Sequence, residues 1–177
     1  MALKLKRPQK PVDLCLDGTL RAAWEEADAK LNLARKQRFG DDRLNSSVKS
    51  LAQEVLRLQE QMKTETVTFT IEGMRRDKWD ELVAANPERD DVPTDKSYGF
   101  NATALAAAAI PASIVGAKQD GEAVDFDAST DWESLADEMT DQQYEAFFIA
   151  VLSVNRGRQD IPFSASASQE MRPSAES

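Results

Sequence analysis

Residues 44–71 read LNSSVKSLAQEVLRLQEQMKTETVTFTI, and two hydrophobic periods follow one another in this stretch. In the first part, apolar side chains recur at alternating steps of four and three residues, namely Leu44, Val48, Leu51, Val55, Leu58 and Met62. This spacing is typical of the contact face of a coiled-coil helix. From residue 66 to residue 71 the period becomes two, because threonines alternate with larger apolar residues, as in a half-buried strand. The stretch therefore predicts a helix that leads directly into a strand.

The segment before this stretch carries the same helical period with smaller residues. Its apolar positions are Leu20, Trp24, Ala27, Leu31 and Ala34. A Phe-Gly-Asp-Asp turn at residues 39–42 separates the two segments. Residues 17–63 are therefore predicted to form an antiparallel helical hairpin. Its two apolar stripes either pack only on each other, or part of the seam also recruits a second subunit or a client protein.

Residues 1–16 are predicted to be a basic arm followed by a short strand. The first ten residues are basic and contain a proline, and no apolar signal-peptide core follows them, so a flexible arm is expected. Residues 12–16 read Val-Asp-Leu-Cys-Leu, and this alternation of side chains indicates a short, half-buried strand. Because one strand cannot satisfy its own backbone, this segment is expected to pair with residues 66–71. Pairing across a dimer is the alternative.

Residues 64–157 are predicted to form a small helical domain that the strand at 66–71 opens. Helices are expected at 75–85, at 100–110 and at 131–156, with Thr140 able to cap a second segment of the last one. The segments 87–99 and 116–130 are interpreted as loops, and residues 158–177 have the composition of a disordered tail. The predicted fold class is mainly α: an N-terminal antiparallel helical hairpin plus a small helical domain with one or two short strands.

The composition excludes several classes of function. The chain has 22 Lys and Arg against 31 Asp and Glu, a net charge of −9, no histidine and one cysteine. Histidine is the commonest general acid or base and a common metal ligand, and an acidic balance does not suit a general nucleic-acid binder. A lone cysteine fits a reducing compartment, and no apolar run approaches the roughly 20 residues that span a bilayer. We therefore expect no enzyme activity, cofactor, metal, nucleic acid or membrane association, and a protein that works by binding other proteins.

Two clusters resemble functional sites, but each has an ordinary explanation. Residues 125–129, Asp-Phe-Asp-Ala-Ser, begin like a calcium loop within an acidic segment, yet the glycine and the closing glutamate of such a loop are missing. We interpret this segment as a solvated acidic loop. Basic residues surround Trp79, as in a nucleic-acid patch, but acidic residues are interleaved with them. A helix start with internal ion pairs explains this second cluster better.

Several local sequences then occur in an order that resembles a known family. They are LCLDG (14–18), VTFTI (67–71), RRDKWDELV (75–83), NPER (86–89), YGFN (98–101), WESL (132–135), QYEAF (143–147), VNRG (154–157) and IPFS (161–164). Together they resemble the tail assembly chaperones of long-tailed, siphovirus-type phages of actinobacteria. The resemblance covers nearly the whole chain, although its motifs are diffuse. It departs from the family at Glu88, where a second proline is expected.

The resemblance implies a non-enzymatic assembly factor in the host cytoplasm. Such chaperones bind the tape measure protein and keep its long hydrophobic helices soluble until the major tail protein polymerises around it. They are often made in two forms by a programmed frameshift. The implied partners are therefore the tape measure protein and the major tail protein, and a homo-oligomer is also compatible with the sequence. The competing hypothesis is a structural virion component, such as a minor tail or connector subunit.

The candidate client-binding residues are the large apolar side chains of the hairpin and of the last helix. They are Trp24, Leu31, Val48 and Val55 in the hairpin, and Tyr144, Phe147, Phe148 and Leu152 in the last helix. The small residues Ala104 and Ala106–Ala109 would permit close approach of a client helix. All of these side chains can instead belong to the protein's own core.

Overall fold

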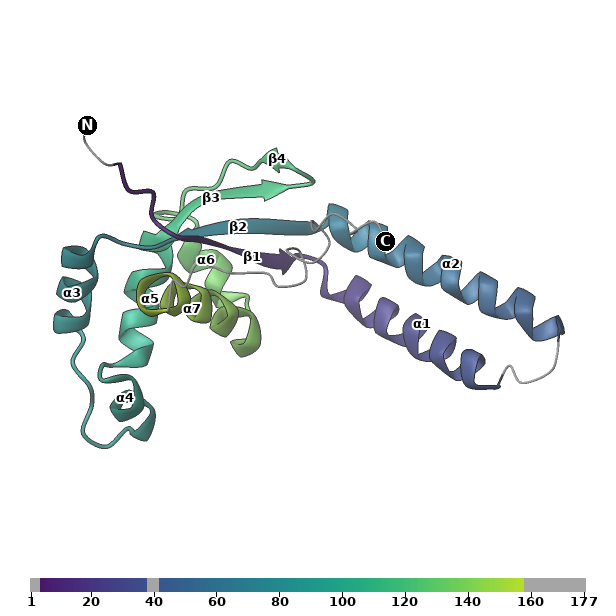
Figure 1. Cartoon of the computed structure of the whole chain (residues 1–177), viewed down its shortest axis with the longest axis horizontal. Helices are drawn as coiled ribbons and strands as arrows, with labels where there is room; N and C mark the ends of the chain where they lie inside the picture. The colour runs from purple at the N-terminus through teal and green to yellow at the C-terminus, as the bar shows by residue number, and fades with distance from the viewer. Residues whose placement is uncertain (1–3, 38–41, 158–177) are drawn as a thin grey trace, which may run out of the picture.

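The computed structural model describes residues 4–37 and 42–157, and it confirms a mainly helical chain. Figure 1 shows two parts: a globular body, residues 4–16 and 65–157, and a pair of helices that projects from it. We call these parts the body and the helical pair. The elements in chain order are β1 (Gln9–Cys15), α1 (Gly18–Gln37), α2 (Asp42–Thr64), β2 (Thr66–Glu72), α3 (Arg76–Ala85), α4 (Pro93–Tyr98), α5 (Ala102–Ser113), β3 (Ile114–Gln119), β4 (Glu122–Ala123), α6 (Trp132–Asp137) and α7 (Asp141–Arg156).

The strands form one antiparallel sheet in the order β1-β2-β3-β4. The predicted pairing of residues 12–16 with residues 66–71 is confirmed, because Val12 lies opposite Phe69 and Leu14 lies opposite Val67. Neighbouring strands β1 and β2 are connected through α1 and α2. The helical pair is therefore an insertion between two paired strands, in the place where a β-hairpin has its loop, as Figure 1 shows.

The prediction of one or two short strands is wrong, because the described residues contain four. The missed strand β4 and most of β3 lie in the segment 116–130 that is interpreted as an acidic loop, and β3 begins just before it, at Ile114. Ile114 and Val115 are β-branched, but residues 116–119 read Gly-Ala-Lys-Gln, so the strand signal in the sequence is only two residues long. Pairing with β2 continues the strand to Gln119. Asp120 and Gly121, both at positive φ (49° and 84°), form the two-residue turn to β4 that suits an antiparallel hairpin.

The expectation of a flexible arm is wrong for its last residues. Gln9 and Lys10 belong to β1, and Arg7 forms an ion pair with Glu72. The carbonyl of Pro8 accepts a hydrogen bond of 2.9 Å from the amide of Gly73. Residue 73 is close to α7, because a Cβ atom on Gly73 would lie only 2.9 Å from the carbonyl oxygen of Val154. These residues are ordered because they continue the hydrogen bonds between β1 and β2 as far as Gly73, next to the end of α7. The predicted turn at 39–41, the side chain of residue 44 and the predicted tail at 158–177 lie outside the described residues.

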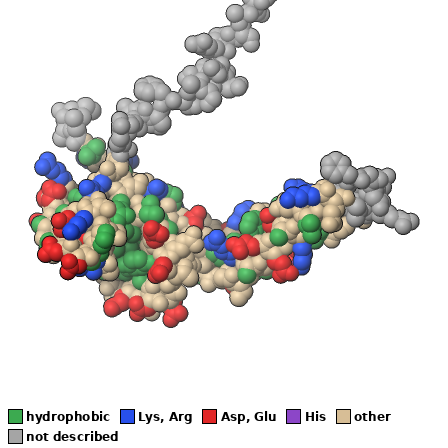
Figure 2. All heavy atoms as spheres, turned by 90° about the horizontal axis from the view of Figure 1, so that it is seen from below, with side chains coloured by type: hydrophobic (Ala, Val, Ile, Leu, Met, Phe, Trp, Pro, Cys, Tyr) green, Lys and Arg blue, Asp and Glu red, His purple; other side chains and the backbone are tan. Residues whose placement is uncertain are grey.

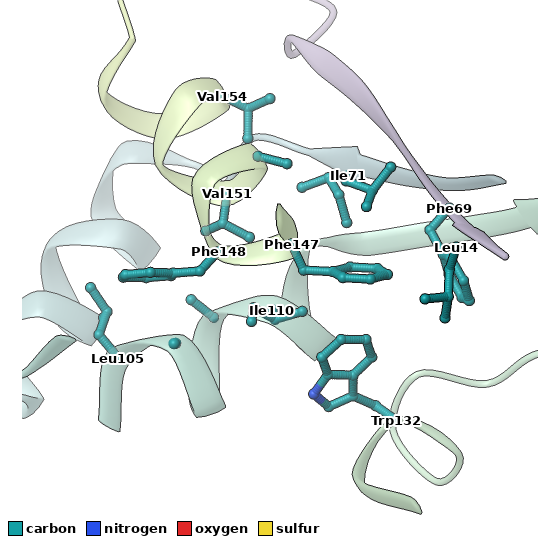
Figure 3. Packing of buried hydrophobic residues seen from close by; sticks show 14 of the residues in the cluster. Leu14, Phe69, Ile71, Leu105, Ile110, Trp132, Phe147, Phe148, Val151 and Val154 are labelled. Atoms are coloured by element: carbon teal, nitrogen blue, oxygen red, sulfur yellow. The ribbon is translucent and has the colours of Figure 1, made fainter. Parts of the chain in front are cut away.

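The core of the body lies between the sheet and the helices α5 and α7, which cover one face of it (Figure 1). Phe69 and Phe147 are almost fully buried, and their ring centroids lie 5.3 Å apart in an edge-on arrangement. Figure 3 shows these rings between the strands and Ile110 of α5, with Trp132 of α6 below them. The Trp132 ring contacts the Phe147 ring at 4.9 Å. Three elements, β2, α6 and α7, thus contribute rings to one aromatic cluster, which packs on α5.

The helical pair has a separate core that comes from its own two helices. The buried residues are Ala27, Leu31, Val48, Val55 and Leu58, with Leu20, Trp24, Ala34, Leu51 and Ala52 packed around them. These residues are those of the heptad stripes, with Ala52 in addition. The carboxylate of Asp17 accepts a hydrogen bond of 2.8 Å from the amide of Thr19 at the start of α1. This contact is the cap that a helix N-terminus requires.

Candidate protein-binding surfaces

The structure places most of the predicted client-binding residues inside the chain. Leu31, Val48 and Val55 are buried in the helical pair, and Phe147 and Phe148 are buried in the body. These five side chains support the fold and present little surface to a partner. The other three predicted residues, Trp24, Tyr144 and Leu152, are half-buried. Ala106 and Ala109 are also buried, whereas Ala107 is exposed.

Trp24 lines an open groove where the helical pair joins the body. We call this the junction groove; it has a volume of about 920 Å³. Its sheet wall consists of outward-facing residues of β1, β2 and β3, and its helical wall comes from the ends of α1 and α2 nearest the sheet. The lining residues are Asp13, Cys15, Arg21, Trp24, Gln59, Met62, Lys63, Thr66, Thr68, Lys118, Asp120 and Gly121. Both signs of charge are present, so this groove suits a partner that has polar groups and also an apolar side chain that contacts Trp24 and Met62.

Tyr144 lines a second groove, which lies between α5 and the α6–α7 region. We call this the acidic groove; its volume is about 450 Å³. The lining residues are Ala107, Pro111, Ala128, Ser129, Trp132, Glu133, Ala136, Asp137 and Tyr144. The Trp132 and Tyr144 rings are 6.1 Å apart at a tilt of 37°, and small side chains flank them. The groove therefore combines an aromatic and aliphatic floor with the carboxylates of Glu133 and Asp137.

Two polar atoms of this groove have no partner in the described part of the chain. Trp132 is only 5% exposed, and its Nε1 makes no hydrogen bond, yet the atom is not sealed from solvent. Figure 3 shows this nitrogen on the side of the indole that faces away from Phe147. The Tyr144 hydroxyl likewise makes no hydrogen bond, and burial raises the pKa of this phenol, so it keeps its proton at neutral pH. Both groups are free to bind a partner.

The chain segment that supplies most of the acidic groove carries the net negative charge of the sequence. Residues 119–155 contain ten carboxylates and no lysine or arginine, which leaves 21 acidic and 22 basic residues in the rest of the chain. Within the described residues, none of these ten carboxylates forms an ion pair. Figure 2 shows acidic side chains along the rim of the body and mixed charges on the helical pair. The field at this groove therefore attracts cations.

The clusters that resembled functional sites have structural roles. The Asp127 carboxylate accepts hydrogen bonds from the amide and hydroxyl of Ser129, which lowers the pKa of Asp127 and closes a local turn. No group of three or more potential metal ligands occurs among the residues that the structure describes. Trp79 is buried against the Phe100 ring, and the basic residues around it pair with acidic neighbours on α3. The first cluster therefore closes a turn, and the second contributes a buried ring and local ion pairs at α3.

The acidic groove is the feature that the sequence interpretation missed. Its residues come from α5, the segment before α6, α6 itself and α7, and no periodicity in one segment places them together. The sequence feature that could have indicated this groove is Trp132, a tryptophan that lies among carboxylates. It starts a helix that is too short to show an apolar stripe. Within the described residues, no helix is long and apolar enough to cross a membrane. Models of known families, curated proteins and solved structures give no match to this chain.

Proposed function

We propose that this chain is a phage tail assembly chaperone that binds the tape measure protein in the host cytoplasm and keeps it soluble during tail assembly. It acts by binding, not by catalysis. The family resemblance supplies the partner. The observation that carries the proposal is the junction groove, in which the apolar side chains of Trp24 and Met62 line an open surface beside charged side chains. An apolar stripe of a client can bind there while the acidic chain keeps the complex soluble.

The buried heptad residues change the expected mode of binding. Leu31 and Val55 hold α1 against α2, so a client that used them would first have to separate the helices. The junction groove requires no such opening, since its walls are already apart. Binding there should survive moderate salt better than a purely electrostatic complex, because buried apolar area is not screened by ions.

Co-expression with the tape measure protein of the same phage tests this function. The tape measure protein should aggregate alone and stay soluble with this chain. Thr68→Arg places a bulky charge on the sheet wall of the junction groove and should abolish this rescue. Thr70→Arg is the matched control, because Thr70 is the next outward-facing residue of β2 and does not line the groove. Both variants should retain the far-UV circular dichroism of the wild type.

Two outcomes would defeat the proposal. One is a tape measure protein that stays insoluble in the presence of the wild-type chain. The other is a virion that contains this chain in stoichiometric amounts, as mass spectrometry of purified particles would show. The second outcome would support a minor tail or connector subunit instead.

A further inference from the structure

The helical pair is attached to the body by short connections. β1 ends at Cys15 and α1 begins at Gly18, while α2 ends at Thr64 and β2 begins at Thr66. The hydrophobic core of the pair and that of the body are separate clusters with no residue in common. Within the described residues, no ion pair joins the two parts. The angle between the pair and the body therefore depends on the connections and on contacts beside them.

Hydrogen bonds at the boundary link the pair to the sheet. The amide of Leu16 donates to the carbonyl of Glu65 at 2.9 Å. The side-chain amide of Gln119, at the end of β3, donates to the carbonyl of Thr64 at 2.7 Å. Because these bonds lie at the boundary itself, a rotation of the pair about that boundary can keep them. The boundary thus has the form of a hinge, in which a few residues at the ends of elements absorb the movement.

The two walls of the junction groove carry charges that attract each other. Arg21 and Lys63 stand on the helical wall. Asp13 and Asp120 stand on the sheet wall beside Lys118, so carboxylates outnumber cations there. Each cation of the helical wall pairs only within its own helix, and neither carboxylate of the sheet wall forms an ion pair in the described part of the chain. Opposite charges therefore face each other across a space of about 920 Å³.

Trp24 gives a second, independent indication of another arrangement. Its Nε1 is buried and has no hydrogen-bond partner within the described residues, although the side chain lines the groove. Buried polar groups are nearly always hydrogen-bonded, and a buried donor without an acceptor destabilises the arrangement that buries it. The sheet wall offers acceptors, because carboxylates and threonine hydroxyls line it. A movement of the helical wall towards the sheet would bring these acceptors closer to the indole.

We propose that the helical pair rotates about its boundary with the sheet and closes the junction groove, so that the groove is a clamp with an open and a closed state. Figure 1 shows the open state, in which the pair extends away from the sheet. In the closed state, Arg21 and Lys63 approach the carboxylates of the sheet wall. Any role of this clamp in holding a client rests on the proposed function, whereas the movement itself is a property of the free chain.

Single-molecule fluorescence energy transfer within the free chain tests the movement. Cys15 is the one cysteine, so Cys15→Ser leaves Lys36→Cys and Gly116→Cys as the labelled positions. Lys36 is exposed near the far end of α1, and Gly116 is exposed on β3, where an added Cβ meets no atom within 4 Å. Between about 0.01 M and 1 M salt the Debye length falls from about 30 Å to about 3 Å. The population with the shorter distance should therefore decrease as salt is added.

A double variant removes the attraction at low salt. Arg21→Gln with Lys63→Gln should lower the ratio of closed to open chains about fivefold, the effect of losing two exposed ion pairs. The matched control is Lys30→Gln with Arg57→Gln. These two cations also lie one on each helix and pair with a glutamate of the same helix, but they do not line the groove. The control should keep the ratio within about twofold, and both variants should retain the far-UV circular dichroism of the wild type.

Two results would overturn the proposal. One is a single distance that stays the same at every salt concentration. The other is an equal change in the two double variants, which would reflect net charge alone. The outcome is separable from that of the proposed function, because no client is present. Closure without rescue of the tape measure protein would defeat the function alone, and rescue by a chain with one fixed distance would defeat this inference alone.

Discussion

The helical pair and the body differ in how their cores are built. Among the described residues, the two helices of the pair enclose five buried side chains, which come from one stripe on each helix. In the body, strands and helices together enclose eighteen, including a cluster of aromatic rings. A two-helix unit has only one interface, so few neighbours compensate for the loss of one contact. We therefore expect the pair to open locally while the body stays folded.

Their charges differ in the same way. In the described part of the helical pair, the ion pairs lie within single helices, for example Arg21 with Glu25 and Lys30 with Glu26. These exposed pairs contribute little to stability and hold no other element in place. The body has similar local pairs on α3, but Arg7 also pairs with Glu72 of β2, and Arg89 and Asp95 join the loop before α4 to α4 itself. Among the described residues, only the body therefore has ion pairs between different elements, and its carboxylates near α6 form no ion pair.

The largest effect should come from the aromatic cluster of the body. Phe147→Ala removes a fully buried ring that contacts both Phe69 and Trp132, and it should lower the free energy of unfolding by about 3–5 kcal/mol. Urea denaturation followed by tryptophan fluorescence measures this change. Phe147→Leu, which keeps much of the volume, should cost less than half as much. Equal losses in the two variants would contradict a packing role for the ring.

A substitution in the seam of the helical pair should act locally. Leu31→Ala should cost about 2–3 kcal/mol, the lower part of the range for a buried leucine, because only one other helix packs against it. Amide exchange should accelerate in α1 and α2 and stay unchanged in β2. The matched control is Leu33→Ala on the same helix, where the side chain is 57% exposed and the cost should stay within about 0.5 kcal/mol. Faster exchange throughout the body in Leu31→Ala would show that the two parts unfold together.

The cap of α7 should give a smaller change. The Thr140 hydroxyl accepts a hydrogen bond from the Gln143 amide, and the side-chain oxygen of Gln143 accepts one from the Thr140 amide. Thr140→Ala should therefore lower the free energy of unfolding by about 1 kcal/mol, and Thr140→Ser should restore most of it. Because α7 covers the sheet, this loss should appear in global unfolding. A loss confined to the exchange rates of the first turn of α7 would contradict that coupling.

Local patterns in the sequence predicted the parts of the fold that local physics determines. The alternation around Val67 and Phe69, the stripe of Val48 and Val55 and the cap at Thr140 are each readable within one segment, and each corresponds to the structure. The strand β3 and the acidic groove depend on segments far apart in the chain. Most of β3 consists of small or polar residues that pair with β2, and the rings and small side chains of the groove come together only in the folded chain. The same limit applies to the predicted binding residues, since a large apolar stripe looks alike whether a partner or the protein itself covers it.

The body and the helical pair should also differ in acid, where one carboxyl group of the body changes its charge. Hydrogen bonds from the Arg89 side chain, and from the amides of Ala102 and Arg89, lower the pKa of Asp95 to about 2. A carboxyl group with a lowered pKa stabilises the fold above its unfolded pKa, which is about 3.9, and this contribution disappears as the pH falls towards 2.

Asp95→Asn removes the titrating group, so the stability difference between wild type and variant should be constant above about pH 5 and should shrink between about pH 4 and pH 2. Urea unfolding of both proteins at several pH values gives this difference directly. Glu54→Gln in the helical pair is the control, because Glu54 meets only Arg57 on an exposed helix face, so its difference should be small at every pH. If the difference for Asp95→Asn were the same at pH 3 as at pH 7, the charged form of Asp95 would not be what holds α4 to its loop. The neutral amide would then lose only hydrogen-bond geometry, and the proposed contrast between the charges of the body and those of the pair would fail.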